Sequence, residues 1–384
     1  MMSKLLDCSV ELGPIRPPSE AYSLLIRVTR NCPWNRCQFC GLYKGQKFEL
    51  RPVEDVLKDI EKAKTISEEI KELAWRTGDG GRIRDIAASV YSHYQDNAAI
   101  RNVALWMWAG SKSAFLQDAN TLIMRTPELV QVISYLKQTF PEINRVTSYA
   151  RSKTAAKKSV EELKSLRDVG LSRLHIGMES GSDIVLSYMN KGVTAEEHIK
   201  GGKNVKESGI SLSEYIMPGL GGKRMSAEHV VGTARVLNAI NPEFIRIRTL
   251  YVRKGMPLWT NLENGDFEMQ TEDEIVEELG NLIEKLEVSS MVKSDHIMNL
   301  LPEIDGKFPE AKSLCLAVIN KYLLLSPEER INYRLGRRAG VYDKLDDLYD
   351  VHKRPKVDEA IRAINLEPDA NIEEIINRLK MGFI

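Results

Sequence analysis

The sequence predicts an α/β fold in which a parallel sheet curls into a full or partial barrel. Two observations predict it: six short apolar segments alternate with segments of helical periodicity, and the alternation is interrupted by only one insertion. Strands that are joined through helices run parallel, and such crossovers are right-handed. Groups that act on a ligand are therefore expected at the carboxyl ends of the strands.

The six expected strands are short and mostly apolar, and they cover residues 22–28, 114–117, 145–149, 171–176, 211–217 and 244–251. Helical periodicity follows each of the first five strands, at residues 53–73, 127–139, 155–169, 195–208 and 227–240. Pro52 is acceptable at the start of the first helix, because the first helical residues need no hydrogen-bond donor. These segments predict one β/α domain.

The flanking regions do not follow the repeat. We expect a lead-in at residues 1–20, the barrel at 21–255 with an insertion at about 76–110, and an all-helical carboxyl-terminal region at 256–384. The insertion carries a glycine-rich turn at 78–81, and its residues Trp106 and Trp108 are expected to pack within it. The helical region shows a capping signature at Thr271, ahead of apolar positions at helical spacing.

Composition limits the partners. Lys and Arg number 54, as do Asp and Glu, so the net charge is zero and gives no strong signal for nucleic acid. No apolar run approaches the ~18 residues of a membrane span, and the first thirty residues lack the apolar core of a signal peptide. We therefore expect a cytoplasmic protein without a transmembrane segment, acting on a small molecule, a lipid or a cofactor precursor.

Three of the five cysteines, Cys32, Cys37 and Cys40, follow the first strand directly. Such a Cys-x4-Cys-x2-Cys cluster suits metal ligation better than disulfides, and soft thiolates select zinc, copper(I) or iron–sulfur clusters. A structural zinc site needs a fourth ligand, but Cys8 and Cys315 are distant in sequence and no histidine lies near. An iron–sulfur cluster with one open iron is favoured over a zinc knuckle or unrelated thiols.

This segment resembles the radical S-adenosylmethionine (SAM) superfamily. There, a three-cysteine loop after the first strand of a partial (β/α)6 barrel, similar to a TIM barrel, holds a 4Fe-4S cluster. The usual spacing is three and two residues with an aromatic residue before the last cysteine; Phe39 supplies the aromatic, while the first gap is one residue longer here. The resemblance covers about residues 20–255 and implies the same partial barrel.

The resemblance also implies an activity. Cys32, Cys37 and Cys40 would each bind one iron, and SAM would chelate the fourth. One electron from a donor such as ferredoxin or flavodoxin would then cleave SAM to methionine and a 5′-deoxyadenosyl radical, which abstracts hydrogen from an unknown substrate. The alternative is a noncatalytic iron–sulfur or zinc protein that uses the barrel for binding or electron transfer.

Cofactor contacts are expected at the remaining strand ends. By resemblance, Glu179 meets the ribose hydroxyls and Asp118 receives the methionine ammonium group; Ser148 and Arg151 are candidates for the ribose and the carboxylate. Glycines after the fifth strand permit close approach of the nucleoside. The expected cofactor-binding residues are Phe39, Tyr43, Asp118, Asn120, Ser148, Arg151, Glu179, Ser180, Met217, Gly219, Arg246 and Leu250.

Several positions keep two interpretations. Asn120 suits a cofactor contact or a turn, and His175 is more typical of a satisfied core histidine. Arg246 and Arg248 lie on one side of their strand, where they either hold an anion inside the barrel or pair with acids outside it. Asp295 and His296 are expected to open a helix, where they either supply a proton donor or ligand to the active site or belong to an ordinary helix start capped by Ser294.

Overall fold

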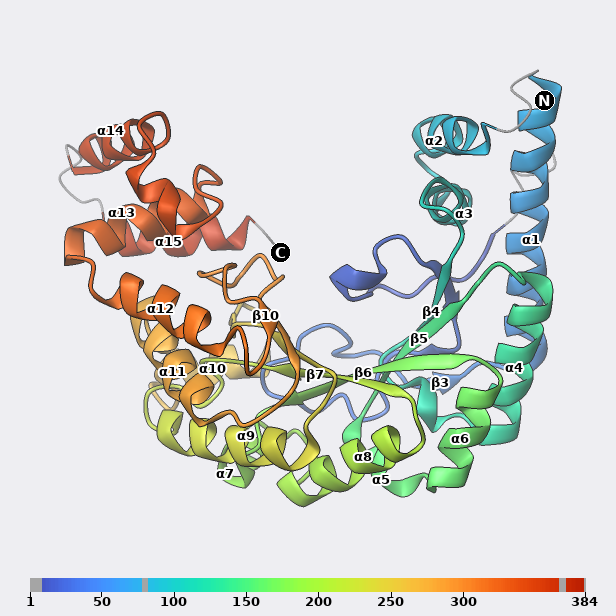
Figure 1. Cartoon of the computed structure of the whole chain (residues 1–384), viewed down its shortest axis with the longest axis horizontal. Helices are drawn as coiled ribbons and strands as arrows, with labels where there is room; N and C mark the ends of the chain where they lie inside the picture. Colours follow the sequence, from blue (N-terminus) through green and yellow to red (C-terminus); the bar gives the residue numbers. More distant parts are fainter. Residues whose placement is uncertain (1–8, 78–81, 366–370, 383–384) are drawn as a thin grey trace. The chain divides into compact units, whose positions relative to one another are not determined.

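The computed structural model describes residues 9–77, 82–365 and 371–382 (Figure 1). The expected glycine-rich turn at 78–81 lies outside the described residues. Contacts divide the chain into two compact units, of which the first comprises residues 1–36, 42–177 and 197–213, and the second comprises residues 37–41, 178–196 and 214–384.

The strands of the main sheet follow the order β1-β4-β5-β6-β7-β8-β9-β10. They are β1 (Leu24–Arg27), β4 (Ser113–Gln117), β5 (Arg145–Ala150), β6 (Leu171–Glu179), β7 (Ser211–Ile216), β8 (Phe244–Ile247), β9 (Met291–Lys293) and β10 (Gly306–Lys307). The pairs β1–β4, β4–β5, β5–β6 and β8–β9 are parallel, whereas β9–β10 is antiparallel. The first six of these strands are those predicted, so the α/β class with a mostly parallel sheet is confirmed.

Helices α4 and α6 lie along one face of the strands of the first unit (Figure 1). The helices of this unit are α1 (Val53–Arg76), α2 (Ile83–His93), α3 (Ala98–Trp108), α4 (Thr126–Thr139), α5 (Ser152–Lys157), α6 (Val160–Asp168) and α8 (Ala195–Glu207), with 3-10 turns at Pro18–Glu20 and Thr121–Ile123. A capping box between Ser159 and Glu162 fixes the start of α6. A separate short ladder joins β2 (Thr29–Arg30) to β3 (Glu49–Leu50).

The insertion is helical. Helices α2 and α3 pack on each other and on α1. Trp106 is buried, with its ring edge-on to Phe140 at 5.1 Å, whereas Trp108 remains 44% exposed beside Tyr22. The expected packing role is therefore confirmed for Trp106 and partial for Trp108.

An aromatic cluster fills the interior of the first unit. Phe115, Tyr149 and His175 come from three adjacent strands, with ring centroids 5.1–6.3 Å apart. The Nε2 atom of His175 lies 3.4 Å from the buried carboxylate of Glu20, which also receives Arg145 at 2.9 Å. Burial opposes ionisation of Glu20, but His175 and Arg145 hold the pKa of its carboxyl below the usual value. His175 is thus a paired core histidine, as expected.

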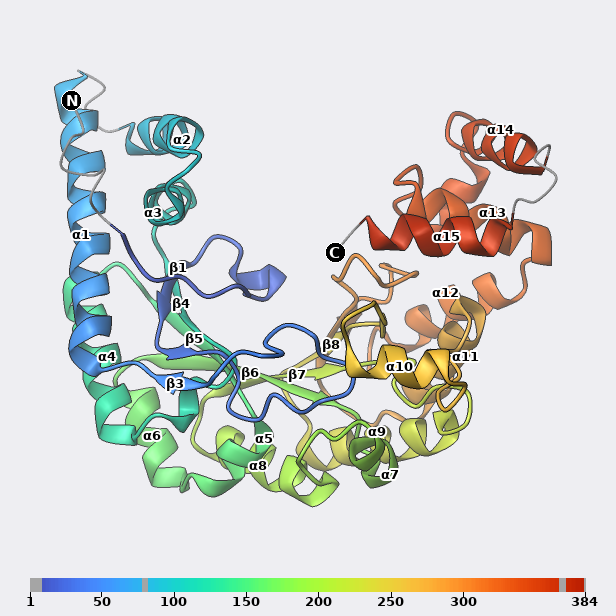
Figure 2. The same cartoon turned by 180° about the vertical axis from the view of Figure 1, so that it is seen from behind.

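In the second unit α11 lies between α9 and α12, and α13 contacts α14 and α15 (Figure 2). The helices are α7 (Asp183–Tyr188), α9 (Ser226–Ile240), α10 (Pro257–Glu263), α11 (Glu272–Lys285), α12 (Lys312–Leu323), α13 (Pro327–Arg338), α14 (Arg354–Asn365) and α15 (Ile372–Met381), with a 3-10 turn at Leu345–Tyr349. Thr271 and Glu274 form the expected capping box of α11. Among the described residues, no helix combines the length and apolar character needed to cross a membrane.

Two expectations for the carboxyl-terminal region are wrong. The region is not all-helical, because β9 and β10 extend the sheet beyond β8. Ser294 caps no helix: its hydroxyl donates to the carbonyl of Leu301 at 2.9 Å within a turn. β9 has three residues and β10 has two, which is too short for a visible period of two, so they are defined only by pairing, of β9 with β8 and of β10 with β9.

Candidate active site

The three clustered cysteines form no disulfide and are half-buried. Cys32 belongs to the first unit, and Cys37 and Cys40 belong to the second. Over residues 9–77, 82–365 and 371–382, no group of three or more His, Cys, Asp or Glu side chains is assembled as a metal site. The donor chemistry nevertheless fits an iron–sulfur cluster, because three reduced thiols within nine residues supply only soft ligands.

The flanks of the cysteine segment, residues 32–40, are fixed in the first unit. The side-chain amide of Asn31 donates to the carbonyl of Lys47 at 2.6 Å, and Lys44 donates to the carbonyl of Asn35 at 2.8 Å. The Asn35 amide also donates to the carbonyl of Tyr43. Asn31 and Asn35 have φ values of 67° and 45°, in the left-handed region that asparagine tolerates better than most residues. Hydrogen bonds therefore hold the chain on both sides of the cysteine segment in place.

In the second unit the same segment is held through its backbone. The N–H of Gln38 donates to the carbonyl of Met189, and its carbonyl accepts from the N–H of Leu258, both at 2.9 Å. Its neighbour Phe39 packs against a buried apolar cluster that includes Met217 and Leu250. The middle of the cysteine segment is therefore held by backbone hydrogen bonds at Gln38 and by the packing of Phe39.

Asp118 is fully buried at the end of β4, and both of its carboxylate oxygens are occupied. Its Oδ2 accepts from Nη2 of Arg27 at 2.8 Å and from the backbone N–H of Asn31 at 3.2 Å. Its Oδ1 accepts from the hydroxyl of Tyr43. Burial and the Asp118 carboxylate raise the pKa of Tyr43, so that this hydroxyl stays protonated and donates. The expected role of Asp118 toward an ammonium group stays a prediction.

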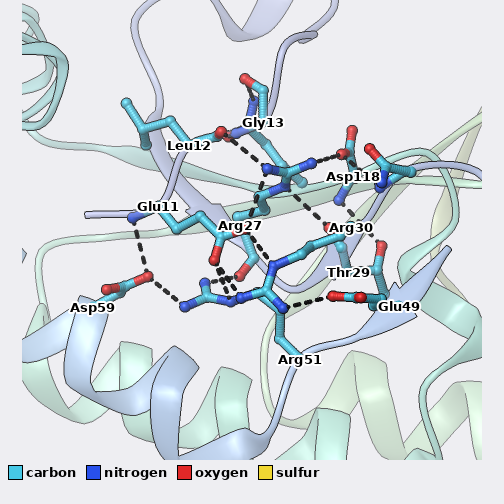
Figure 3. A network of polar contacts seen from close by, with 12 residues as sticks. Glu11, Leu12, Gly13, Arg27, Thr29, Arg30, Glu49, Arg51, Asp59 and Asp118 are labelled. Carbon is cyan, nitrogen blue, oxygen red and sulfur yellow. Dashed lines mark hydrogen bonds and ion pairs between the residues drawn. The ribbon is translucent and has the colours of Figure 1, made fainter. Parts of the chain in front are cut away.

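Behind Asp118 lies an ionic network that fixes the lead-in (Figure 3). Glu11 accepts from Arg27 at 3.2 Å and from Arg30 at 2.7 Å, and it lies 3.2 Å from Arg51. The hydrogen bond to Arg30, together with the neighbouring arginine charges, holds the pKa of Glu11 below its usual value despite partial burial. Asp59 completes the network with an ion pair of 2.8 Å to Arg51. Glu11 is thereby held beside the end of β1.

Three other expected residues lie in the first unit. Asn120 accepts from the backbone N–H of Arg151 at 3.0 Å and donates to Thr154 at 2.8 Å, which corresponds to the turn interpretation. The guanidinium of Arg151 lies over the ring of Trp34, 5.3 Å from its centroid. Ser148 is buried, and its hydroxyl donates to the carbonyl of Leu116 at 2.9 Å. Their cofactor contacts stay predictions.

The second unit brings several expected residues together. Met217 and Leu250 share the apolar cluster on which Phe39 packs. Gly219, with φ of 88°, approaches Leu250 so closely that an added Cβ would lie 3.4 Å from the Leu250 Cβ. An aromatic ring, a methionine and a side-chain-free glycine make an apolar wall suited to the flat face of a nucleobase.

Beside this wall lies a charged pair. Lys191 is 3.2 Å from Glu179 and 5.4 Å from the ring centroid of Phe39, and both charged side chains are 12% exposed. Glu214 is fully buried in β7, and neither of its oxygens has a hydrogen-bond partner. Burial, together with the nearby Glu179 carboxylate, raises the pKa of Glu214 well above its usual value. Glu214 therefore holds its proton more tightly than an exposed glutamic acid does.

Ser180 is the first member of a buried polar chain. Its hydroxyl lies 2.9 Å from Nδ1 of His229, whose Nε2 is 3.8 Å from Glu278. Glu278 accepts from the backbone N–H of Gly219 at 2.7 Å and from the Ser226 hydroxyl. Burial lowers the pKa of His229, so this ring is neutral. This series of buried polar contacts connects α9 and α11 to the loops that follow β6 and β7.

Arg246 has a partner of its own, because its guanidinium pairs with Asp295. Arg248 lies over the ring of Tyr215, 5.9 Å from the centroid. Burial and the Arg248 charge lower the pKa of His296 to about 4, so it carries no charge at pH 7. The acid that pairs with Arg246 lies just after β9, and the expected cofactor contact of Arg246 stays a prediction.

Sequence analysis missed four residues that this geometry singles out: Lys191, Glu214, His229 and Glu278. Lys191 and Glu278 sit in helical or loop segments whose charges resemble ordinary solvated positions. An acid inside an expected strand, between Ser213 and Tyr215, was the available signal for Glu214. Pairing of His229 with Ser180 depends on residues 49 apart in sequence, which no local pattern reports.

Residues 26–234 match the family model described as the radical SAM superfamily. The match covers more than half of the chain and includes all three clustered cysteines. The chain belongs to the radical SAM superfamily. Members of this superfamily are enzymes that use a 4Fe-4S cluster and SAM, and these are the cofactors of the present chain.

Two curated relatives share part of the chain. The tRNA uridine(34) acetyltransferase of Methanocaldococcus jannaschii is 25% identical over 118 residues, which is 30% of this chain and 22% of that protein. The enzyme of the same name from Methanocaldococcus infernus is 25% identical over 120 residues, 31% of this chain and 22% of that protein. The matches thus span about a fifth of the length of these relatives.

Among solved structures, similarity is weak. Elp3 of Methanocaldococcus infernus is 15% identical with a TM-score of 0.41, covering 56% of this chain and 55% of that chain. Coproporphyrinogen III oxidase of Escherichia coli is 13% identical with a TM-score of 0.44, covering 68% and 51%. The hydrogenase maturase HydG is 16% identical with a TM-score of 0.42, covering 93% and 81%.

Proposed function

We propose that Cys32, Cys37 and Cys40 hold the 4Fe-4S cluster, and that the enzyme reductively cleaves SAM to abstract hydrogen from a small-molecule, lipid or cofactor-precursor substrate. The observation that carries this proposal is the set of three reduced thiols inside the region that matches the superfamily. Bound cluster and SAM supply one-electron cleavage of the sulfonium to methionine and a 5′-deoxyadenosyl radical. The electron comes from a small reductant such as ferredoxin or flavodoxin.

The second unit supplies an adenosine site in this proposal. The wall formed by Phe39, Met217, Gly219 and Leu250 supports stacking of the adenine. Glu179 supports hydrogen bonding to the ribose hydroxyls, since a carboxylate accepts two donors at once. Lys191, 3.2 Å from Glu179 and 5.4 Å from the ring centroid of Phe39, supports the orientation of the Glu179 carboxylate beside the wall.

The balanced charge supports a small or apolar substrate over a polyanion, since a nucleic-acid enzyme usually carries a basic surface. The partial similarity to tRNA-modifying acetyltransferases supports tRNA as the second candidate. Turnover with a deuterated metabolite and lipid extract, compared with turnover on bulk tRNA, separates the two. Deuterium transferred into 5′-deoxyadenosine from the extract supports the first candidate, whereas SAM cleavage stimulated only by tRNA contradicts it.

Anaerobic reconstitution tests the cluster assignment. Wild type should take up about four irons per chain and form 5′-deoxyadenosine when SAM and dithionite are added. Cys37→Ala should lose both, while Cys315→Ala, a buried thiol in α12, should retain both. Full iron content and cleavage in Cys37→Ala would contradict the assignment.

A further inference from the structure

We infer that Asp118 is a positioning residue that fixes both ends of the cysteine segment through the backbone N–H of Asn31 and the hydroxyl of Tyr43. Asn31 immediately precedes Cys32, and Tyr43 follows Cys40 by three residues. The inference rests on the proposed function, because it treats residues 32–40 as the holder of the cluster. It assigns Asp118 to the protein's own loop and not to a ligand.

The two contacts use different oxygens of one carboxylate. Oδ2 accepts from Asn31 at 3.2 Å, and Oδ1 accepts from Tyr43. The carboxylate and the tyrosine are well inside the first unit, since Asp118 is 0% and Tyr43 3% exposed. A carboxylate held between two donors in this way has little freedom to rotate, so movement at one end of the segment is resisted at the other.

The charge of Asp118 is compensated by Arg27, which donates to the same carboxylate oxygen as the N–H of Asn31. Arg27 donates to Oδ2 at 2.8 Å, and Glu11 in turn pairs with Arg27 at 3.2 Å (Figure 3). A fully buried carboxylate is tolerated only when it is paired and hydrogen-bonded. Arg27 supplies the charge, while Asn31 and Tyr43 supply the remaining hydrogen bonds, so the network specifies the orientation of the carboxylate.

This arrangement serves cluster binding through preorganisation. The stretch between Asn31 and Tyr43 loses conformational entropy when its thiols converge on one cluster, and fixing its ends in advance lowers that cost. Outer contacts that orient ligands typically change metal affinity by roughly 10–100-fold when removed. Asp118 contacts Asn31 and Tyr43 and none of the three cysteines. A substitution of Asp118 therefore leaves all three iron ligands in place, and its effect on cluster retention can be measured separately from the loss of a ligand.

The ammonium role expected from resemblance competes with this one. A carboxylate offers about four acceptor positions, and three donors already occupy Asp118. The two roles differ in what a mutation changes. Loss of a positioning residue affects the apo segment and cluster retention, whereas loss of an ammonium acceptor affects only the affinity for SAM.

Tyr43→Phe and Asp118→Asn test the inference. Tyr43→Phe removes one hydroxyl and keeps the buried ring, so it remains informative if Asp118→Asn folds poorly. Glu49→Gln is the matched control, because Glu49 lies at the exposed rim of the same network, paired with Arg30. We expect iron loss from the reconstituted protein to a chelator to be about 10-fold faster in both test variants and unchanged in Glu49→Gln.

Hydrogen exchange of the apo protein gives a readout that needs no cluster. Amides of residues 31–43 should exchange faster in Tyr43→Phe and Asp118→Asn than in wild type or Glu49→Gln. Wild-type exchange and iron-loss rates in both test variants, with only the KM for SAM raised in Asp118→Asn, would overturn the inference and support the ammonium role. Wild-type protein that takes up no iron would refute the proposed function, while the exchange experiment would still decide whether Asp118 fixes the segment.

Discussion

Glu278 of α11 accepts a hydrogen bond from the backbone N–H of Gly219, 2.7 Å away in the loop after β7. The same carboxylate accepts from the Ser226 hydroxyl and lies 3.8 Å from His229. A helix outside the six β/α repeats thus determines the shape of a glycine loop proposed to contact the adenosine. The carboxyl-terminal region is therefore part of the proposed cofactor environment and not only an appendage.

Replacing Glu278 tests this dependence. Glu278→Ala should lower the free energy of unfolding by about 2–3 kcal/mol, because it leaves the buried Gly219 N–H without an acceptor. Urea denaturation measures the loss, and equilibrium dialysis with SAM measures the expected weaker binding. Glu277→Ala, at the exposed neighbouring position, should change stability by no more than about 0.5 kcal/mol. Equal stability of the two variants would show that the contact is dispensable.

The sequence could predict the elements with long local patterns. Strand and helix periodicity located the parallel sheet and α11, and cysteine spacing located the candidate ligands. It could not predict β9, whose three residues are defined by pairing with β8, or the turn at Ser294. The local sequence pattern shows the period of a helix, but it does not show which strand a three-residue strand pairs with.

Side-chain partners were harder to predict than elements. The Tyr43 hydroxyl and the Asp118 carboxylate lie 75 residues apart in sequence, yet they form one buried contact. Ser148 illustrates the same limit, since its hydroxyl is satisfied by the carbonyl of Leu116 on the adjacent strand. Chemical type indicated that these residues were polar and placed near strand ends, but only the tertiary packing determined what each one contacts.

Asn35 lies in the longer first gap of the cysteine motif, and its backbone conformation can be tested. Its φ is 45°, which costs roughly 1–2 kcal/mol for a residue other than Gly, Asn or Asp. Asn35→Gly should therefore retain iron after reconstitution, whereas Asn35→Val should lose much of it. Iron content and the visible absorption of the cluster measure the difference. A Val variant that matches the Gly variant would mean that the left-handed turn is not required.

Because Glu214 is buried, we expect the free energy of unfolding to depend on pH in a specific way. Its pKa in the folded chain is raised above the usual 4.5, so the native state retains a proton that the unfolded state releases. The protonated Glu214 therefore contributes its full share of the free energy of unfolding below about pH 4.5. This contribution is lost as the pH rises from there through the pKa of the folded state. Glu214→Gln, which cannot ionise, should therefore become more stable relative to wild type as pH rises, by up to about 1.4 kcal/mol per pH unit.

Urea denaturation at several pH values measures this divergence. Glu277→Gln is the matched control, because the same substitution at an exposed helical position should follow the wild-type profile. Parallel curves for wild type and Glu214→Gln between about pH 5 and 8 would show that Glu214 is ionised in the folded chain.

Gly232 and Gly181 provide a final test, at the place where α9 meets the loop after β6. A Cβ on Gly232 would lie 2.7 Å from the Cα of Ser182 and 2.8 Å from the carbonyl oxygen of Gly181. Backbone atoms cannot yield as a flexible side chain does, so Gly232→Ala must displace the loop that carries Ser180. We expect a loss of about 3 kcal/mol, which exceeds the gain of about 1 kcal/mol that alanine brings to a helix interior.

Gly280→Ala in α11 is the matched control. Its added Cβ would meet only a side-chain methyl of Ile319, at 3.1 Å, which can shift by a few tenths of an ångström. This variant should remain within about 1 kcal/mol of wild type, because the helix-propensity gain offsets the local adjustment. Thermal unfolding ranks the two variants, and SAM affinity should fall only for Gly232→Ala, because the displaced loop directly follows Glu179 at the end of β6. If the two variants lose equal stability and bind SAM equally, the contact between α9 and this loop does not position the cofactor residues.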